Sequence, residues 1–397
     1  MLFLGFIPPV NTMFAIGSRA AEQPAYPLEL LRCAACSLVQ IGLEVDAEIL
    51  FPKSYPYLSG TTRALRQNFA DLRTQTEQKI GLEAGSFVVD IGSNDGTLLA
   101  NYLNAGYRVL GVEPSQAGDV ARRIGIETLS SYFGLGVARQ LRASHGGAQL
   151  VTAANVFAHI ANVHDVVDGV LELLAPRGVF VSESHYLLDL VETIQYDTIY
   201  HEHLRHYSLT SLTTLLEGHG LEVFDVTRIP THGGSLRAYA ARRGEREQTP
   251  AVAARLADEL DSGLVDGSAF HTFCQRVVQS KVDLYQLLAP IKRRGERVYG
   301  IGAPSRASTL INYTGLDDGV IDAVMEVSSS HKLNKYIPGT RIPVLDEQAL
   351  FADQPEYALL LSWHIADELA DGLRAKGYRG RFIVPLPEPR VLDVALA

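Results

Sequence analysis

The chain has 397 residues, which is too long for a single hydrophobic core and indicates two or three domains. Its 47% hydrophobic and 20% charged residues exclude a largely disordered chain. The net charge of −10 gives no general attraction to DNA or RNA, and three cysteines are too few for a disulfide framework, which fits a reducing cytoplasm.

The segment 1–17 is apolar enough to raise the question of a signal peptide. It contains no basic residue, and Pro8 and Pro9 interrupt the apolar run, so we interpret it as folded chain. No uninterrupted apolar stretch of about 18 residues is present, so the sequence predicts a cytoplasmic protein without a membrane-spanning helix or a membrane partner.

Along the chain, residues 1–58 are rich in Pro, Gly and Tyr and are expected to form a small N-terminal module. An amphipathic helix is expected over 61–79. Short β-branched runs that alternate with helical stretches then predict a doubly wound α/β sheet within residues 59–245. The expected strands are Phe87–Ile91, Arg108–Val112, Gln149–Ala153 and Gly178–Ser182.

A helical stretch over about 251–288 supplies a bridge, residues 246–290, to a second α/β unit, residues 291–397. The expected strands of this unit are Arg297–Ile301, Val320–Val327, Tyr357–Trp363 and Arg381–Pro385.

The turn after the first strand of the larger sheet carries the first chemical signal, through Asp90, Gly92, Asn94, Asp95 and Gly96. Its glycines let the backbone approach a ligand, and the next helix offers free amides. Its acids would repel a pyrophosphate but suit a cationic sulfonium and amino group.

At the end of the second strand stands Glu113-Pro114, where a carboxylate can accept hydrogen bonds from a ribose. Asn155, after the run 149–153, would face the same ligand, although it could simply be a cap. This order of strand, loop, helix and acid predicts a class I S-adenosylmethionine methyltransferase. The alternative is a glycine turn with two solvated acids.

A histidine-rich string, Tyr196–His203, contains Tyr200, Glu202 and His203. These residues are unlike those that only pack in a hydrophobic core, because buried ionisable side chains need polar partners. Histidine titrates near neutrality and can take and return a proton. The spacing of the two histidines is not the i, i+4 pair of zinc proteases, so acid–base chemistry is favoured over a metal or a structural polar cluster.

In the second unit, Gly300-x-Gly302 follows a strand and precedes a helix, where converging amides can hold a diphosphate. The pattern lacks the third glycine and a clear ribose acid of a dinucleotide site, and a tight turn is the alternative. Hydroxyls and positive charge nearby come from Ser305, Arg306, Ser308 and Lys332.

Four stretches, Val89–Gly96, Ala154–Ile160, Tyr196–His203 and His232–Arg237, resemble the sugar C-methyltransferases that act on nucleotide-linked 4-keto deoxysugars. The resemblance extends through Gly300–Arg306 and Lys332–Val344. It implies an α/β protein in which a class I Rossmann-like methyltransferase domain lies between a small zinc-module-like N-terminal region and a C-terminal Rossmann-like domain. The last domain would bind the nucleotide diphosphate of the sugar.

The resemblance implies methyl transfer from S-adenosylmethionine to C3, with C5 as the alternative, next to the ketone of an NDP-4-keto-6-deoxysugar, with TDP the expected nucleotide. It makes His203 the base and Glu202 the residue that orients it, with Tyr200, Tyr55 and His159 at the keto oxygen or in a proton relay. Substrate contacts are expected from Tyr57, His232, Gly233, Gly302, Ser305, Arg306, Ser308, Asn312 and Lys332. Whether Tyr55 or Tyr57 faces the sugar stays open.

Relatives carry a zinc module built from two Cys-x-x-Cys pairs, whereas this chain has one pair, Cys33 and Cys36, with Cys274 far away. One pair cannot close a tetrahedral site. Either an upstream piece is missing, which we favour slightly, or zinc has been lost, and the two thiols are then small hydrophobes in a loop.

Two other functions stay open. Methyl transfer to oxygen or nitrogen of another small acceptor would keep the Asp90–Gly96 loop but would not need a base beside a ketone. A non-catalytic nucleotide-sugar-binding protein would keep the Gly300 turn and tolerate loss of His203. We expect a monomer or a weak dimer.

Overall fold

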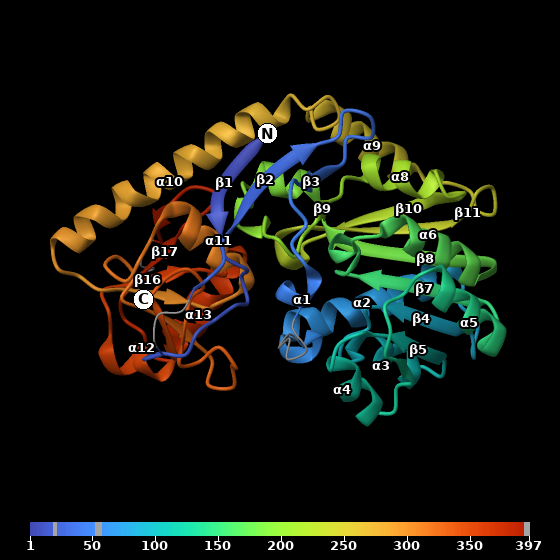
Figure 1. Ribbon diagram of the computed structural model, residues 1–397, viewed down its shortest axis with the longest axis horizontal. Helices are drawn as coiled ribbons and strands as arrows, with labels where there is room; N and C mark the ends of the chain where they lie inside the picture. The colour runs from blue at the N-terminus through green and yellow to red at the C-terminus, as the bar shows by residue number, and fades with distance from the viewer. Residues whose placement is uncertain (19–21, 52–57, 393–397) are drawn as a thin grey trace.

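The computed structural model describes residues 1–18, 22–51 and 58–392, and it contains three β-sheets. In Figure 1 the two α/β units lie at opposite ends of the molecule, with the N-terminal strands between them. Among the described residues, no helix is long and apolar enough to cross a membrane.

The N-terminal sheet is antiparallel, with the order β1-β2-β3-β9. Three strands, β1 (Leu2–Ile7), β2 (Tyr26–Arg32) and β3 (Val39–Ile41), come from the module. The apolar start of the chain is thus a strand. The fourth strand, β9 (Arg205–His206), follows the histidine-rich string, so this sheet fastens the module beside that string.

The central sheet has the order β10-β11-β8-β7-β4-β5-β6, and only β11 runs antiparallel to its neighbours. Because the chain winds outward in both directions from β4, the carboxyl ends of β4 and β7 form the switch point where α/β sheets bind ligands. The strands are β4 (Phe87–Ile91), β5 (Arg108–Val112), β6 (Thr128–Leu129), β7 (Ala148–Ala154), β8 (Leu174–His185), β10 (Leu221–Ile229) and β11 (Ser235–Arg242).

Helices cover both faces of this sheet, which explains why every residue of β4 is buried. The predicted first helix is α2 (Arg63–Ile80), capped by the Thr62 side chain on the Leu65 N–H and ended by left-handed Gly81. The others are α1 (Ala47–Leu50), α3 (Thr97–Asn104), α4 (Ala117–Arg123), α5 (Leu135–His145), α6 (Val163–Leu173), α7 (Leu187–Glu192) and α8 (Leu209–Glu217), with 3-10 turns η1 (Ser59–Thr61), η2 (Phe157–His159), η3 (Tyr196–Thr198) and η4 (Thr231–Gly233).

The helical bridge differs from the single stretch expected over 251–288. It consists of α9 (Pro250–Asp261) and α10 (Ala269–Arg293). α9 packs onto the central unit, where fully buried Glu259 accepts hydrogen bonds from the Tyr186 hydroxyl at 2.8 Å and the Thr210 N–H at 2.9 Å. Only α10 spans the two units, arching along the top of Figure 1.

The second α/β unit has the sheet order β14-β15-β13-β12-β16-β17-β18, with a parallel centre and antiparallel edges. Its switch point lies at the carboxyl end of β12, directly before Gly302. The strands are β12 (Val298–Ile301), β13 (Ala323–Glu326), β14 (Lys335–Tyr336), β15 (Pro343–Asp346), β16 (Tyr357–Leu360), β17 (Arg381–Val384) and β18 (Arg390–Val391). The helices are α11 (Ser305–Thr314), α12 (Gln348–Asp353) and α13 (Ala366–Ala375), with the 3-10 turn η5 (Trp363–Ile365).

Candidate active site

The glycine loop between β4 and α3 is shaped to admit a ligand. Gly92 has φ +67°, and a Cβ on it would lie 2.5 Å from a methyl carbon of Val156, so only glycine fits. Beneath the loop, the Thr152 hydroxyl donates to the buried Asp90 carboxyl at 2.6 Å. Burial raises the pKa of Asp90 to about 7.

Glu113 stands at the carboxyl end of β5 and is 6% exposed. One carboxylate oxygen accepts the Asn94 N–H at 2.9 Å and the other the Ser115 N–H at 2.8 Å. A carboxylate offers about four lone-pair positions, so room for two ribose hydroxyls remains. Pro114 continues the chain from this acid into the turn before α4.

The structure gives Asn94 and Asp95 roles other than the expected ligand contacts. The Asp95 carboxylate accepts hydrogen bonds from the Thr97 hydroxyl at 2.6 Å and from the Gly60 N–H at 2.7 Å, while Gly96 leads into α3. The Asn94 side-chain oxygen accepts the Ser59 N–H at 2.9 Å. Both side chains therefore fasten η1 onto the loop.

Asn155 is the strongest sign of a ligand-binding site. It has φ +57° at the carboxyl end of β7, and both polar atoms of its side chain are buried without a hydrogen-bond partner. Buried amide groups are rarely left unpaired in native proteins. Together with the Gly92 cradle and Glu113, it fits S-adenosylmethionine, whose amino and carboxylate groups could satisfy the amide.

His203 is 8% exposed, and its orientation is fixed by one contact, in which its Nδ1 lies 2.7 Å from the Thr198 carbonyl oxygen. A carbonyl only accepts, so Nδ1 carries the proton and Nε2 keeps its lone pair. Burial, reinforced by the imidazoles of His159 and His185, holds the pKa of His203 well below its ordinary value. The ring is therefore neutral at pH 7 and able to accept a proton at Nε2.

Other rings crowd around His203. The ring centroids of Tyr200, His159 and His185 lie 4.0, 4.9 and 5.2 Å from that of His203. His232, in the η4 turn before Gly233, lies 5.4 Å from His185. The structure thus gathers Tyr200, His159, His203 and His232, four of the expected residues, at the carboxyl edge of the central sheet.

Glu202 is placed differently from expected. Its carboxylate accepts a hydrogen bond from Asn11 at 2.7 Å, and its backbone carbonyl lies 2.6 Å from His159 Nδ1, so it orients His159 rather than His203 in these contacts. The adjacent His201 turns toward β2, with its ring 5.9 Å from that of Tyr26. Tyr55 and Tyr57 lie outside the described residues.

In the second unit, Gly302, with φ +80°, and Ser305 meet at the start of α11. The Lys332 ammonium donates to the Ala303 carbonyl at 2.6 Å, and burial lowers its pKa. Glu326, at the end of β13, accepts the Ala303 N–H at 2.9 Å and the Val327 N–H at 3.0 Å. A carboxylate thus stands where the sequence showed no clear ribose acid, in the same relation to its loop as Glu113.

Three residues of α11 differ from the expected substrate contacts. The Arg306 guanidinium, expected at a diphosphate, is instead engaged with Asp197 of the central unit. The Asn312 amide donates to the Pro338 carbonyl at 2.9 Å and to the Ser308 carbonyl at 2.8 Å, and Ser308 is 2% exposed. These side chains hold α11 in place.

The single cysteine pair does not form a metal centre by itself. No group of three or more His, Cys, Asp or Glu side chains within 1–18, 22–51 and 58–392 is arranged to hold a metal ion. Cys33 and Cys36 lie in a turn closed by the Ser37 N–H on the Cys33 carbonyl at 3.0 Å. Two thiolates leave a tetrahedral zinc ion half-coordinated, so zinc does not fit the described residues.

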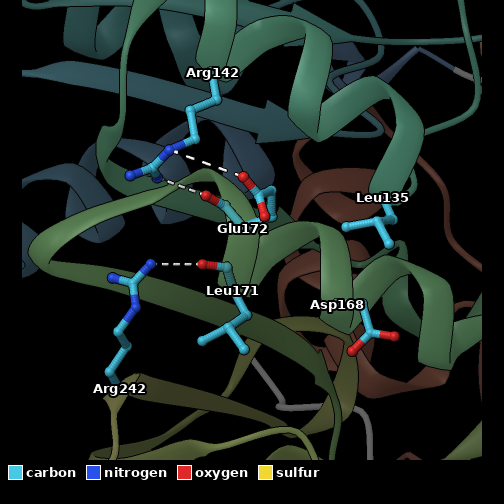
Figure 2. Close-up of a pocket in the computed structure, with 6 residues that line it drawn as sticks. All are labelled: Leu135, Arg142, Asp168, Leu171, Glu172 and Arg242. Carbon is cyan, nitrogen blue, oxygen red and sulfur yellow. Dashed lines mark hydrogen bonds and ion pairs between the residues drawn. The ribbon is translucent and has the colours of Figure 1, made fainter.

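A surface hollow between α5 and α6 lies away from the carboxyl edge of the sheet. Figure 2 shows Arg142 and Arg242 donating to backbone carbonyls of Glu172 and Leu171, at 2.6 Å each. These arginines satisfy carbonyls that the end of α6 leaves free, so we assign the hollow a structural role.

The parallel order around β4 and the glycine loop with Glu113 define a Rossmann-like, S-adenosylmethionine-dependent methyltransferase. A methyltransferase domain model matches residues 60–226, a C-methyltransferase C-terminal domain model residues 230–387, and a zinc-binding domain model residues 1–51. The chain is 35% identical to the C-methyltransferase NovU of Streptomyces niveus over 392 residues, 98% of this chain and 93% of that protein. The chain belongs to the S-adenosylmethionine-dependent C-methyltransferase family.

Solved structures match parts of the chain. The PH0226 protein of Pyrococcus horikoshii OT3 is 15% identical, covers 49% of this chain and 98% of its own, and has a TM-score of 0.39. Magnesium protoporphyrin IX methyltransferase of Synechocystis PCC 6803, with bound S-adenosylmethionine, is 15% identical, covers 45% and 79%, and has a TM-score of 0.35.

The sequence interpretation gave no role to His185, Asp197 and Gln195, and it noted His206 after the histidine-rich string without assigning it one. A signal existed for His185, because it stands three residues after the expected strand end at Ser182, and functional residues gather at the carboxyl ends of strands. No local signal marked Asp197 and Gln195, whose partners lie more than 100 residues away along the chain.

Proposed function

We propose that this C-methyltransferase moves the methyl group to the carbon beside the ketone of an NDP-4-keto-6-deoxysugar, at C3, with C5 as the alternative. The observation that carries the proposal is His203, a neutral imidazole whose Nδ1 is held by the Thr198 carbonyl and whose Nε2 is basic. Carbon must be activated before it can be methylated, and a ketone with a base supplies that activation.

In the proposed reaction, His203 Nε2 takes the proton from the carbon next to the ketone. The electron pair of that C–H bond forms an enolate, whose charge develops on the keto oxygen beside Tyr200 and the neighbouring imidazoles. The enolate carbon then bonds to the methyl group as the S–CH3 bond breaks, and its electrons return to sulfur. Bound S-adenosylmethionine would supply the electrophilic methyl, and the Gly92 loop, Glu113 and Asn155 would hold it.

The nucleotide, TDP in the first instance, would lie at the Gly302 turn with Lys332, Ser305 and Glu326. This assignment is supported by the convergence of amides and a cation at the switch point of the second sheet. We propose a cytoplasmic monomer or weak dimer with no nucleic-acid or membrane partner.

The test mixes the protein with S-adenosylmethionine and a panel of nucleotide-linked 4-keto-6-deoxysugars. The expected product is heavier by one methylene, with the new methyl on carbon by NMR. His203→Asn should bind both ligands but lose roughly two to four orders of magnitude in rate. His271→Asn, at an exposed histidine of α10, is the matched control. A methyl group found on oxygen, or a native rate for His203→Asn, would contradict the proposal.

A further inference from the structure

A buried ion pair joins the two α/β units at η3, in the string of residues that leads to His203. Asp197, in η3, accepts two hydrogen bonds from Arg306, in α11: Nε to Oδ2 at 2.8 Å and a terminal nitrogen to Oδ1 at 2.9 Å. The Trp363 indole donates a third, at 2.7 Å, and its ring lies 4.9 Å from the guanidinium carbon. The Asp197 side chain is fully buried and that of Arg306 is 7% exposed.

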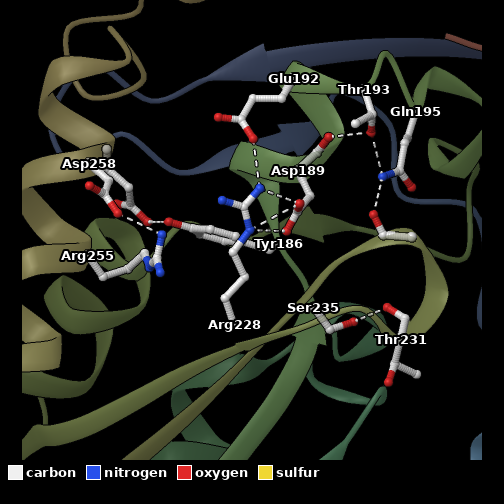
Figure 3. A network of polar contacts seen from close by, with 12 residues as sticks. Tyr186, Asp189, Glu192, Thr193, Gln195, Arg228, Thr231, Ser235, Arg255 and Asp258 are labelled. Atoms are coloured by element: carbon white, nitrogen blue, oxygen red, sulfur yellow. Dashed lines mark hydrogen bonds and ion pairs between the residues drawn. The ribbon is translucent and has the colours of Figure 1, made fainter.

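The Arg306 guanidinium is also connected, through Gln195, to the turn that carries His232. It donates to the Gln195 side-chain oxygen at 3.2 Å and to His364 Nδ1 at 2.9 Å. The Gln195 amide in turn donates to the Gly233 carbonyl at 2.6 Å, next to His232. Figure 3 shows Gln195 on the loop after α7, bonded to Thr193. Arg306 therefore holds the loops that carry His203 and His232.

The contact between Arg306 and Asp197 is linked to His203 by one step of backbone. The residue after Asp197 is Thr198, whose carbonyl accepts the proton of His203 Nδ1 at 2.7 Å. The next carbonyl, of Ile199, accepts the Thr309 hydroxyl of α11 at 3.2 Å. α11 thus fixes the backbone on both sides of the carbonyl that orients the imidazole.

We propose that Arg306 and Asp197 are positioning residues. Through this ion pair, the second α/β unit fixes the position of the Thr198 carbonyl, and this carbonyl fixes the ring orientation and tautomer of His203. This rests on His203 being the base of the proposed function. The second α/β unit, which is expected to hold the nucleotide, then also orients the catalytic base. Proton removal by His203 therefore depends on the packing of this unit against η3.

The first test compares rates. Asp197→Asn together with Arg306→Gln removes both charges, because either change alone leaves an unpaired buried charge that endangers folding. We measure solvent deuterium entering the 4-keto sugar with S-adenosylhomocysteine as the second ligand, and kcat and KM for methyl transfer. The double variant should lose about 10- to 100-fold in exchange and kcat, the usual effect of a misplaced catalytic group, with KM within about twofold.

Two single variants complete the series. Trp363→Phe removes one hydrogen bond to Asp197 but keeps an aromatic ring beside Arg306. It should lower the exchange rate and kcat by less than the double variant does. Should the double variant fail to fold, this variant carries the test. Lys292→Gln breaks the 3.0 Å ion pair with Asp322, at the amino ends of β12 and β13 in the second unit, and it should keep native exchange.

The second readout needs no substrate. In protein with 15N-labelled histidine, native His203, assigned by its loss in His203→Asn, should show a protonated Nδ1 and a bare Nε2. The double variant and Trp363→Phe should shift it to a mixture of tautomers, and Lys292→Gln should leave it unchanged. An unchanged tautomer with unchanged exchange in a folded double variant would overturn the proposal. A changed tautomer supports it even if the native protein methylates no ketone, an outcome that overturns only the proposed function.

Discussion

Replacing Glu113 tests whether the carboxylate at the end of β5 holds a ribose. Its two oxygens accept the Asn94 and Ser115 N–H groups, and a carboxylate has further lone pairs that can accept the hydroxyls of a ligand. At 6% exposure, water does not compete freely for this carboxylate. A hydrogen bond to a charged group contributes about 1.5–3 kcal/mol, so Glu113→Ala should weaken binding roughly 10- to 160-fold.

Titration calorimetry with S-adenosylhomocysteine measures this loss on folded protein. Glu113→Gln should give an intermediate loss, because it keeps one acceptor oxygen but turns an amide toward a backbone N–H. The matched control is Glu127→Gln, since the Glu127 side chain is 66% exposed and lies just before β6. It should bind with native affinity.

Glu113 also braces the Asn94 backbone, so a loss of affinity alone would not identify the contact. A ligand analogue without the 2′- and 3′-hydroxyls separates the two effects. It should bind more weakly than S-adenosylhomocysteine to the native protein and equally to Glu113→Ala. If the analogue and the parent ligand lose affinity by the same factor in the variant, Glu113 acts only through the loop and the ribose contact is refuted.

Two predictions concern pH. Because burial holds the pKa of His203 well below 6.5, the acid limb of kcat/KM should lie below pH 6.5, and a limb above it in pH–rate profiles would contradict His203 as the base. Burial lowers the pKa of both His206 and His232 to about 4, so the unfolded chain binds more protons than the folded one between pH 6.5 and 4. The stability held above pH 6.5 should therefore fall as pH drops to 4, by up to about 3 kcal/mol for each histidine, in urea unfolding curves. Equal free energies at pH 7.5 and 4.5 would refute this.

The parts of the site that local rules describe were predictable. The run Phe87–Ile91 is a strand with these bounds, and Gly92 and Glu113 stand at the ends of β4 and β5. These features are predictable because the sequence signals for a strand, a glycine turn and a helix follow one another within one short segment. The strand starts of the second unit at Tyr357 and Arg381 follow the same logic.

Roles that depend on distant partners were not predictable. Asp95 was interpreted by its charge, yet its carboxylate holds Gly60, 35 residues earlier. Arg306 was interpreted from its place after Gly302, yet its partner Asp197 lies 109 residues away in another domain. A charged residue near a glycine turn has the same sequence signal whether it meets a ligand or a neighbouring domain, and only the docked domains separate the two.

The turn at Cys33 and Cys36 carries only one of the two cysteine pairs of a zinc site, and hydrogen bonds to another segment hold it in place. Ser37 donates its hydroxyl to the Val265 carbonyl at 2.9 Å, and the Arg32 guanidinium donates to the same carbonyl, which ties the turn to the segment between α9 and α10. If these bonds replace a zinc ion, Cys33→Ser with Cys36→Ser should leave Tm unchanged, and chelators should have no effect. Arg32→Met should lower Tm by about 1–3 °C, because it removes a hydrogen bond from a charged group. The measurements are thermal unfolding and metal content of this chain. Zinc near one equivalent that disappears in the double cysteine variant would show that further ligands complete the site and would overturn this reading.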